Sequence, residues 1–202
     1  MSNTPLSIES KNKEYFELRL FKITFAKKNM ASALKNLSSY DENNIPSAAD
    51  MTFGIVVADW NAHITHPLYE GCFDTLVKHG ANADNIYVLQ VPGTFELPAA
   101  ARMLASKYPS VDAVICIGCV IKGETKHDEY INLSVANALQ NLSIATSKSF
   151  IFGILTPNNE EQALDRAGGK HGNKGVEAAV TAIRMSELRQ DLNKGKKGKI
   201  GY

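Results

Sequence analysis

The sequence has no long hydrophobic run and no excess of either charge. No apolar stretch reaches the roughly 18 residues that a membrane span needs, and residues 1–16 (MSNTPLSIESKNKEYF) lack the apolar segment of a secretory signal. The 22 basic side chains nearly balance the 21 acidic ones, which argues against nucleic acid or a membrane surface as a partner. We therefore expect a soluble, cytoplasmic protein whose function comes from a local site.

Cysteine is scarce. The chain has three cysteines, Cys72, Cys116 and Cys119, and an odd number cannot pair completely within one chain. Reduced thiols fit the cytoplasm. Cys116 and Cys119 have the C-x-x-C spacing of a redox pair, but such pairs usually open a helix, whereas these two lie inside or at the end of an apolar run. Residues i and i+3 of a strand also point to opposite faces. We interpret all three as buried structural thiols.

Metal-binding and nucleotide-binding signatures are missing as well. His63, His66 and His79 have no Cys or carboxylate neighbours in a metal-ligand pattern. The glycine-rich loop DRAGGKHGNKGVEAA at residues 165–179 lacks both the Walker spacing and the dinucleotide fingerprint. We therefore expect small-molecule ligands, no metal, and no cofactor such as ATP or NAD.

The chain is long enough for one main domain of ordinary size, with 44% hydrophobic residues among 202. Residues 1–50 differ from the rest, because EYFELRLFKITFAKKNM mixes aromatics and lysines without a period and YDENNIPSAAD is a polar spacer. We interpret 1–50 as a loosely ordered N-terminal extension, 51–193 as the domain, and 194–202 as a Lys/Gly-rich, solvated tail.

Strand and helix patterns alternate along the domain. Short β-branched runs, apolar nearly throughout like strands covered on both faces, occur at residues 52–59, 85–91, 111–121 and 149–155. Helical patterns occur at residues 66–80, 94–108, 128–147, 159–168 and 173–192. This alternation predicts a three-layer α/β sandwich: a four-stranded parallel sheet with helices on both faces. Ligands of such sheets bind beyond the C-terminal strand ends.

The first two strand exits carry an aromatic ring and a sharp turn. Trp60, the only tryptophan, follows its strand directly, where its ring either stacks on a planar ligand or covers the core. In VPGTFELP, Pro92 and Gly93 force a turn, and Thr94 is expected to cap the following helix. Outward backbone N–H groups after this turn can bind a polar heterocycle, although capped turns of this kind are common.

The third exit, GETKHDEY at residues 123–130, places a histidine beside an anion-binding turn. Gly123 lets the backbone approach a ligand closely, and the N–H groups of Glu124 and Thr125 precede a helix, where anions are stabilised. His127 follows, and an imidazole can both take and give a proton near neutrality. A lone surface histidine is also often without function.

Beyond the fourth strand lie two cations. Arg166 offers a planar fork suited to phosphate, and Lys174 adds a second positive charge near a helix start.

Phe152 lies midway along the fourth strand and has the position of a core residue within one chain. Together the four exits predict an enzyme that joins a flat heterocycle to a small phosphorylated molecule.

Five motifs in this order and spacing, FGIVVADWN, VPGTFELP, IGCVIKGETKH, FGILT and RAGGKHGNKGVEAA, resemble the lumazine synthase family over about residues 52–192. The resemblance implies a flavodoxin-like fold and the penultimate step of riboflavin biosynthesis. In that step 5-amino-6-(D-ribitylamino)uracil condenses with 3,4-dihydroxy-2-butanone 4-phosphate to 6,7-dimethyl-8-ribityllumazine without a cofactor, releasing phosphate and water.

The resemblance also implies substrate contacts. Those with the aminouracil are Trp60, Thr94, Phe95, Glu96, Cys119, Val120, Ile121 and, from a neighbouring subunit, Phe152. Those with the butanone phosphate are Glu124, Thr125 and Arg166, supported by Lys174. His127 corresponds to the proton-transfer histidine. A site completed by a neighbour implies a homo-oligomer: a pentamer, with a 60-subunit icosahedral shell and riboflavin synthase as a partner left open.

Two features depart from the family. Lys126 and Asp128 flank His127 where members commonly carry Pro-His-Phe. The leader is long, and the segment from Met30 resembles the start of shorter relatives, so we hypothesise that translation begins there and that residues 1–29 lie upstream. Two other functions stay open: a flavodoxin-like module that binds flavin without turnover, and a shell protein that has lost its activity.

Overall fold

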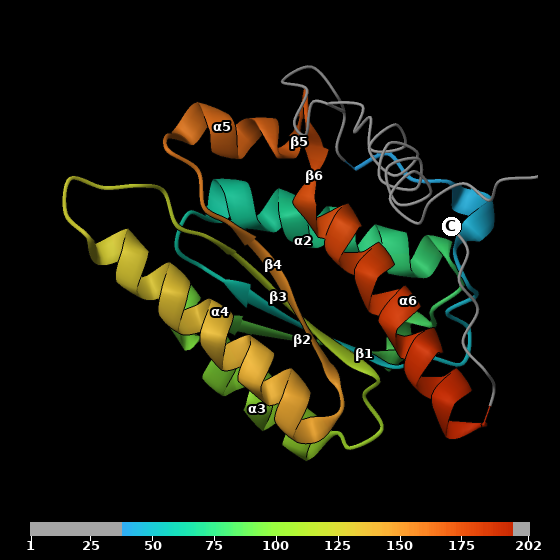
Figure 1. The fold of residues 1–202 in the computed structure, drawn as a ribbon. Helices are drawn as coiled ribbons and strands as arrows, with labels where there is room; N and C mark the ends of the chain where they lie inside the picture. Colours follow the sequence, from blue (N-terminus) through green and yellow to red (C-terminus); the bar gives the residue numbers. More distant parts are fainter. Residues whose placement is uncertain (1–37, 196–202) are drawn as a thin grey trace, which may run out of the picture. The chain divides into compact units, whose positions relative to one another are not determined.

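A computed structural model describes residues 38–195 (Figure 1). Its main sheet contains β1 (Phe53–Ala58), β2 (Ile86–Val91), β3 (Ala113–Cys119) and β4 (Ser149–Leu155), all parallel and ordered β2-β1-β3-β4. This is the order of a flavodoxin-like doubly wound sheet. The fold class predicted from the sequence is therefore confirmed, and each strand lies within two residues of its predicted bounds.

Helices cover both faces of this sheet (Figure 1). One face carries α2 (Ala62–Lys78) and α6 (Lys174–Asn193), and the other carries α3 (Leu97–Lys107) and α4 (His127–Thr146). A short helix, α5 (Glu160–Asp165), follows β4 and leads into a small antiparallel ladder of β5 (Ala167–Gly169) and β6 (Gly172–Asn173). The 3-10 turns are η1 (Glu42–Asn44), η2 (Ala83–Asn85) and η3 (Thr94–Glu96). No helix within residues 38–195 is long and apolar enough to cross a membrane.

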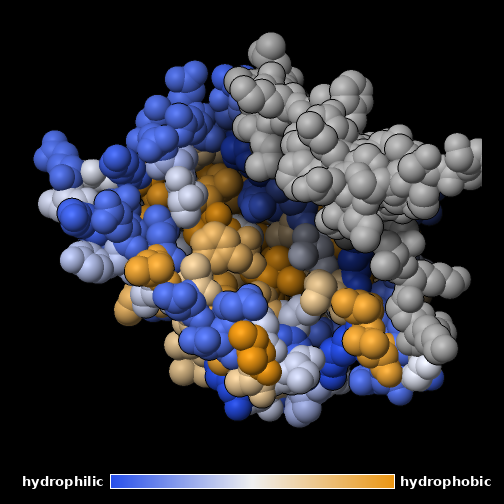
Figure 2. Space-filling model, in the orientation of Figure 1, coloured by the Kyte–Doolittle hydropathy of each residue, from blue (hydrophilic) through white to orange (hydrophobic). Residues whose placement is uncertain are grey.

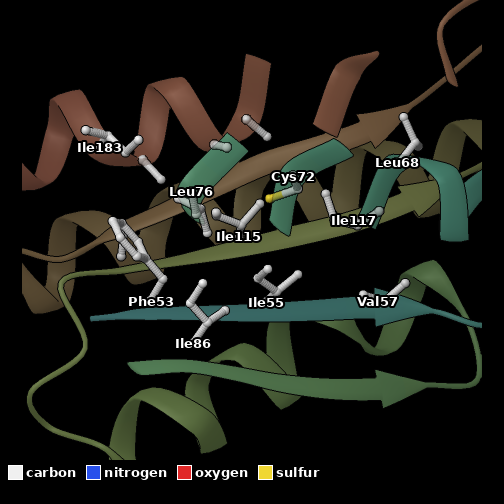
Figure 3. Packing of buried hydrophobic residues seen from close by; sticks show 14 of the residues in the cluster. Phe53, Ile55, Val57, Leu68, Cys72, Leu76, Ile86, Ile115, Ile117 and Ile183 are labelled. Carbon is white, nitrogen blue, oxygen red and sulfur yellow. The ribbon is translucent and has the colours of Figure 1, made fainter. Parts of the chain in front are cut away.

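The apolar strands divide their side chains between two cores. Phe53, Ile55 and Val57 of β1 belong to the core under α2 and α6, where Figure 3 shows them with Leu76 and other residues of the facing helices. Val56 belongs to the other core, under α3 and α4. Alternation along a strand buried on both sides explains why the sequence is apolar nearly throughout.

The edge strand β2 does not follow this pattern. Val88 and Leu89 are 42% and 39% exposed, so the prediction that every strand is covered on both faces is wrong for β2. β2 is an edge strand, and in the single chain its side chains on both faces reach solvent.

The cysteines occupy the positions predicted for structural thiols. Cys72, Cys116 and Cys119 are free and buried, and Cys116 and Cys119 lie in different cores, on opposite faces of β3. Burial raises the pKa of the Cys72 and Cys116 thiols well above their usual range, and raises that of Cys119 to about 12. Thiols of this kind stay protonated and are poor nucleophiles.

Two helix boundaries differ from the prediction for local reasons. The helix predicted at residues 66–80, α2, begins at Ala62 rather than His66, because Asn61 adopts the left-handed conformation (φ 63°, ψ 44°) and starts the helix at once. Asparagine tolerates this conformation better than most residues. The helix then continues through Pro67. The helix predicted at residues 159–168 ends at Asp165, because Ala167–Gly169 pair with Gly172–Asn173 in the β5–β6 ladder.

Helices α2 and α6 approach each other so closely that glycine is required between them. A Cβ atom added to Gly175 would lie 1.8 Å from the backbone oxygen of Leu68. Asn173 joins the same helices: its Nδ2 donates to Pro67 O at 2.8 Å, and its Oδ1 accepts from Gly175 N at 2.8 Å, capping α6. This junction fixes where the loop between β4 and α6 ends.

Residues 38–50, the last part of the predicted N-terminal extension, contact the end of α2. Ala48 is buried and its N–H donates to His79 O at 2.8 Å. Tyr40 Oη lies 3.1 Å from His79 Nε2, and Lys78 Nζ lies 2.6 Å from Glu42 Oε1. Met30 and residues 196–202 of the predicted tail lie outside the described residues. The predicted domain boundaries and the Met30 start stay predictions.

Candidate active site

A cleft of about 780 Å³ opens at the carboxyl ends of β1, β2 and β3. It is lined by the segments that follow these strands: the β1 exit, the η3 turn, the β3 exit and the start of α4. The predicted site residues that line it are Trp60, Thr94, Phe95, Glu96, Cys119, Val120, Ile121, Thr125 and His127. The sheet topology thus brings together residues from three separate strand exits, as ligand sites of parallel α/β sheets require.

Trp60 stands open at the mouth of this cleft. Its side chain is 72% exposed, so the alternative that it covers the core is wrong. The backbone is nevertheless fixed, because Trp60 N donates to Pro92 O at 3.0 Å and Asp59 N donates to Val91 O at 2.8 Å. An exposed indole on a fixed backbone is suited to stack on a flat ligand.

Asn61 also lines the cleft and was missed by the sequence analysis. Its Nδ2 donates to Cys119 O at 3.1 Å, which ties the β1 exit to the end of β3. A small polar residue that follows a strand and precedes a helix was the available signal. Asp128, Tyr130 and Ile131 of α4 line the cleft too and were not predicted.

Thr94 lines the cleft, and its hydroxyl is buried. The side chain is only 6% exposed, yet Oγ1 has no hydrogen-bond partner among the described residues. The predicted helix cap is therefore wrong: Gly93 precedes η3 and Glu96 precedes α3, neither with a side-chain cap. A buried hydroxyl without a partner costs free energy unless a ligand or water satisfies it.

Part of the backbone at the β3 exit already makes hydrogen bonds within the protein. Val120 N donates to Leu155 O and Lys122 N donates to Pro157 O, both at 2.9 Å, which joins this exit to the β4 exit. Gly123 is different, because a Cβ added there would meet no atom within 4 Å. The space over Gly123 faces the cleft, so a ligand can approach the backbone closely at this point.

His127 is the first residue of α4 and is exposed to the cleft. Its backbone N–H lies 3.4 Å from Thr125 Oγ1. Asp128 and Glu129 follow in the first helical turn, where the helix dipole favours carboxylates. The imidazole is thus solvent-accessible beside the open backbone of Gly123, a position from which it can exchange protons with a bound ligand.

The predicted phosphate cations form a separate cluster with Glu177. Arg166 Nη2 lies 2.7 Å from Glu177 Oε1, and Lys174 Nζ lies 3.0 Å from Glu177 Oε2. Arg166 Nη1 donates to His171 O at 2.9 Å. Within residues 38–195, neither Arg166 nor Lys174 lines the cleft that contains His127.

Phe152 and Glu124 also lie outside the lining of this cleft. Phe152 is half-buried on the edge strand β4, against the core under α3 and α4, so it is only partly the core residue that its position in the chain suggests. Figure 2 shows apolar side chains over this region, between α4 and α6 and beside the polar surface of α5. Glu124 is exposed next to Gly123.

The chemistry of the described residues suits organic substrates. No group of three or more His, Cys, Asp or Glu side chains in the described part of the chain is arranged to hold a metal ion. The cleft combines an exposed indole, a buried hydroxyl, an open backbone turn and a histidine at the carboxyl edge of a parallel sheet. These features define a flavodoxin-like α/β enzyme that binds small molecules.

Comparison with known proteins gives the family. The family model for 6,7-dimethyl-8-ribityllumazine synthase matches residues 50–190, and the chain belongs to this family. The 6,7-dimethyl-8-ribityllumazine synthase of Cytophaga hutchinsonii is 55% identical over 156 residues, 77% of this chain and 97% of that protein. The synthase of Porphyromonas gingivalis is 51% identical over 161 residues, 80% of this chain and 99% of that protein. The synthase of Parabacteroides distasonis is 50% identical over 156 residues, 77% of this chain and 97% of that protein.

Proposed function

We propose that the chain condenses 5-amino-6-(D-ribitylamino)uracil with 3,4-dihydroxy-2-butanone 4-phosphate to 6,7-dimethyl-8-ribityllumazine, in riboflavin biosynthesis. The supporting observation is one cleft lined by nine of the predicted site residues, eight substrate contacts and His127, in a chain that the family model matches over residues 50–190. Purified protein mixed with both substrates should raise lumazine absorbance well above the slow spontaneous rate. Flavin binding without turnover would instead support a binding module, and assembly without turnover a shell protein that has lost its activity.

The reaction needs placement and proton transfer. The primary amine attacks the ketone to give a carbinolamine, which loses water to form an imine; phosphate then leaves, and ring closure expels a second water. His127 moves protons in these steps, because its imidazole faces the cleft beside the Gly123 turn. Trp60 stacks on the pyrimidine, while Thr94 Oγ1 gains in a ribityl hydroxyl the partner that it lacks among the described residues.

The phosphate cations and Phe152 contribute from an adjacent protomer. On their own chain, Arg166, Lys174 and Phe152 do not line the described cleft, so a neighbouring copy is the natural source of all three. Apolar side chains exposed around the sheet offer surfaces for such a contact; they include Val88, Leu89, Phe95, Met103, Tyr130 and Leu133. The assembly is a homopentamer, and twelve pentamers can pack as an icosahedral shell.

This shared site predicts complementation between two impaired variants. If His127 and Arg166 of one site come from different chains, co-assembly of equal amounts of His127→Ala and Arg166→Ala protomers rebuilds about one quarter of the sites with both residues. The measurement is the lumazine rate of co-expressed chains against that of homo-oligomers mixed after assembly. Activity no higher than the mean of the two variants would place both residues of a site on one chain.

Arg166→Ala should chiefly weaken the phosphorylated substrate. Hydrogen bonds to charged groups contribute roughly 1.5–3 kcal/mol, so KM for the butanone phosphate should rise about 10- to 100-fold. KM for the aminouracil should stay within about twofold, because Arg166 makes no proposed contact with it. Steady-state titration of each substrate measures both values. An unchanged KM for the phosphorylated substrate would remove Arg166 from the phosphate site.

The three reduced, buried thiols are consistent with a cytoplasmic enzyme. Riboflavin synthase is the partner that we propose for a shell assembly, and its co-purification with the native oligomer tests the association. Sedimentation of the purified protein separates the pentamer from the 60-subunit shell.

A further inference from the structure

One carboxylate, that of Glu177, joins both cations of the proposed phosphate site. Its two oxygens take one cation each, Arg166 at 2.7 Å and Lys174 at 3.0 Å. The three side chains are largely enclosed, with exposed fractions of 18% for Arg166, 30% for Lys174 and 22% for Glu177. Because enclosed charges interact more strongly and are screened less by salt than exposed ones, this cluster holds its geometry better than a surface ion pair.

These contacts leave Arg166 oriented but not saturated. The guanidinium has five N–H donors in a rigid plane; one of these bonds Glu177 Oε1 and another bonds His171 O. Two anchors on different nitrogens fix the plane of the group, and its remaining donors have no partner among the described residues, so they can bind a phosphate. A phosphate site needs this kind of preset fork, since a freely rotating side chain loses entropy on binding.

A third contact reaches Glu177 from the N-terminal side. Ser38 Oγ lies 3.1 Å from Glu177 Oε1 and 2.9 Å from Asn173 O. Ser38 precedes the residues matched by the family model, which begin at residue 50. The segment after it is held on the end of α2 by the Tyr40–His79 and Glu42–Lys78 contacts. The single O–H proton of Ser38 is shared between Asn173 O and the Glu177 oxygen that also holds Arg166, so Glu177 contacts a hydroxyl from outside the matched domain.

We propose that Glu177 is a positioning residue for Arg166, and that Ser38 in turn holds the carboxylate of Glu177. Residues ahead of the matched domain then set the affinity of the enzyme for its phosphorylated substrate. This inference rests on the proposed function, in which Arg166 binds the phosphate group.

The first test shortens the side chain of Glu177 and keeps its negative charge. Glu177→Asp withdraws the carboxylate by one methylene and keeps its charge, so any change reports placement rather than electrostatics. We expect KM for the butanone phosphate and the inhibition constant of inorganic phosphate to rise about tenfold, the ratio that corresponds to about 1.4 kcal/mol. Both kcat and KM for the aminouracil should stay within about twofold, because these depend on other residues.

Ser38→Ala tests the outer contact. Loss of one hydroxyl should raise the same two constants about threefold, in the range of a single net hydrogen bond. Matched controls exist for both variants: Glu187→Asp changes an exposed glutamate elsewhere on α6, and Ser39→Ala changes the exposed neighbour of Ser38. Neither control should alter the phosphate constants.

A double mutant separates this inference from the proposed function. In an Arg166→Ala background, Glu177→Asp should add nothing to KM for the phosphorylated substrate, because the group that it positions is gone. If Arg166→Ala alone leaves that KM unchanged, the proposed phosphate role fails. If Arg166→Ala raises KM while Glu177→Asp and Ser38→Ala do not, only the positioning role fails. Equal losses in kcat and both KM values for Glu177→Asp would indicate general structural damage and would also overturn it.

Discussion

Replacement of His127 by alanine should lower kcat about 10²- to 10⁴-fold and leave a measurable rate above the spontaneous reaction. The imidazole is the only histidine side chain among those lining the described cleft, and the proposed reaction moves protons at the amine, at the departing water and at ring closure. Its removal takes away the group that shuttles these protons, but it leaves the surfaces that hold the two substrates.

The residual rate has its own physical source. Holding two reactants in contact supplies up to about 7–11 kcal/mol of a bimolecular barrier, and Trp60, Thr94 and the Gly123 turn are untouched by the substitution. KM for either substrate should therefore change little while kcat falls. Complete loss of catalysis down to the spontaneous rate would mean that His127 does more than transfer protons.

His63→Ala supplies the matched control for this substitution. His63 is also exposed, and its Nε2 lies 2.7 Å from Glu160 Oε1, but it does not line the described cleft. We expect its kcat to match that of the parent protein. Steady-state rates of both variants, measured with both substrates saturating, decide the matter. A His127→Ala enzyme as fast as the parent would remove the proton-transfer role.

The sequence was sufficient to predict the sheet and most of the residues that line the cleft, because both depend on local patterns. Apolar runs of strand length with helical periods between them indicate a parallel sheet, and a parallel sheet gathers its strand exits at one edge. Trp60, Thr94 and His127 come together for that reason, although they are far apart in the chain. The residues that follow β1, β2 and β3 could therefore be assigned to one site without coordinates, whereas Arg166 and Lys174, beyond β4, do not line the described cleft.

The sequence was insufficient where a contact joins distant segments through side chains alone. Ser38 and Glu177 are 139 residues apart, and no local period links a serine of the N-terminal extension to a glutamate inside a helix. The position of Asn61 between a strand and a helix was visible in the sequence, but its hydrogen bond to Cys119 O joins residues 58 positions apart and could not be predicted from a local pattern. The exposure of Val88 on β2 could not be predicted either, since periodicity reports which residues are apolar and not which strand lies at the edge.

The second large effect is on stability: Gly175→Ala should destabilise the protein by about 3 kcal/mol, at the upper end of the usual cost of overpacking. The added Cβ atom would lie 1.8 Å from Leu68 O and 2.7 Å from the carbon of the same carbonyl. Both are backbone atoms of α2, so no side chain can rotate away, and one helix must move. In an open helix the same substitution would stabilise by about 0.5–1 kcal/mol, but that gain is smaller than the cost of separating α2 from α6.

Gly123→Ala is the matched control for this measurement, because its added Cβ would meet no atom within 4 Å. Its unfolding temperature should change by no more than the usual surface effect, whereas that of Gly175→Ala should fall by roughly 6–12 °C for a chain of this size. Thermal unfolding of the two variants at equal protein concentration makes the comparison. Equal unfolding temperatures would show that the helices separate at little cost. A fall confined to Gly175→Ala, accompanied by a higher KM for the phosphorylated substrate, would show that the α2–α6 contact also holds the Arg166 cluster in place, since α6 begins at Lys174 and carries Glu177.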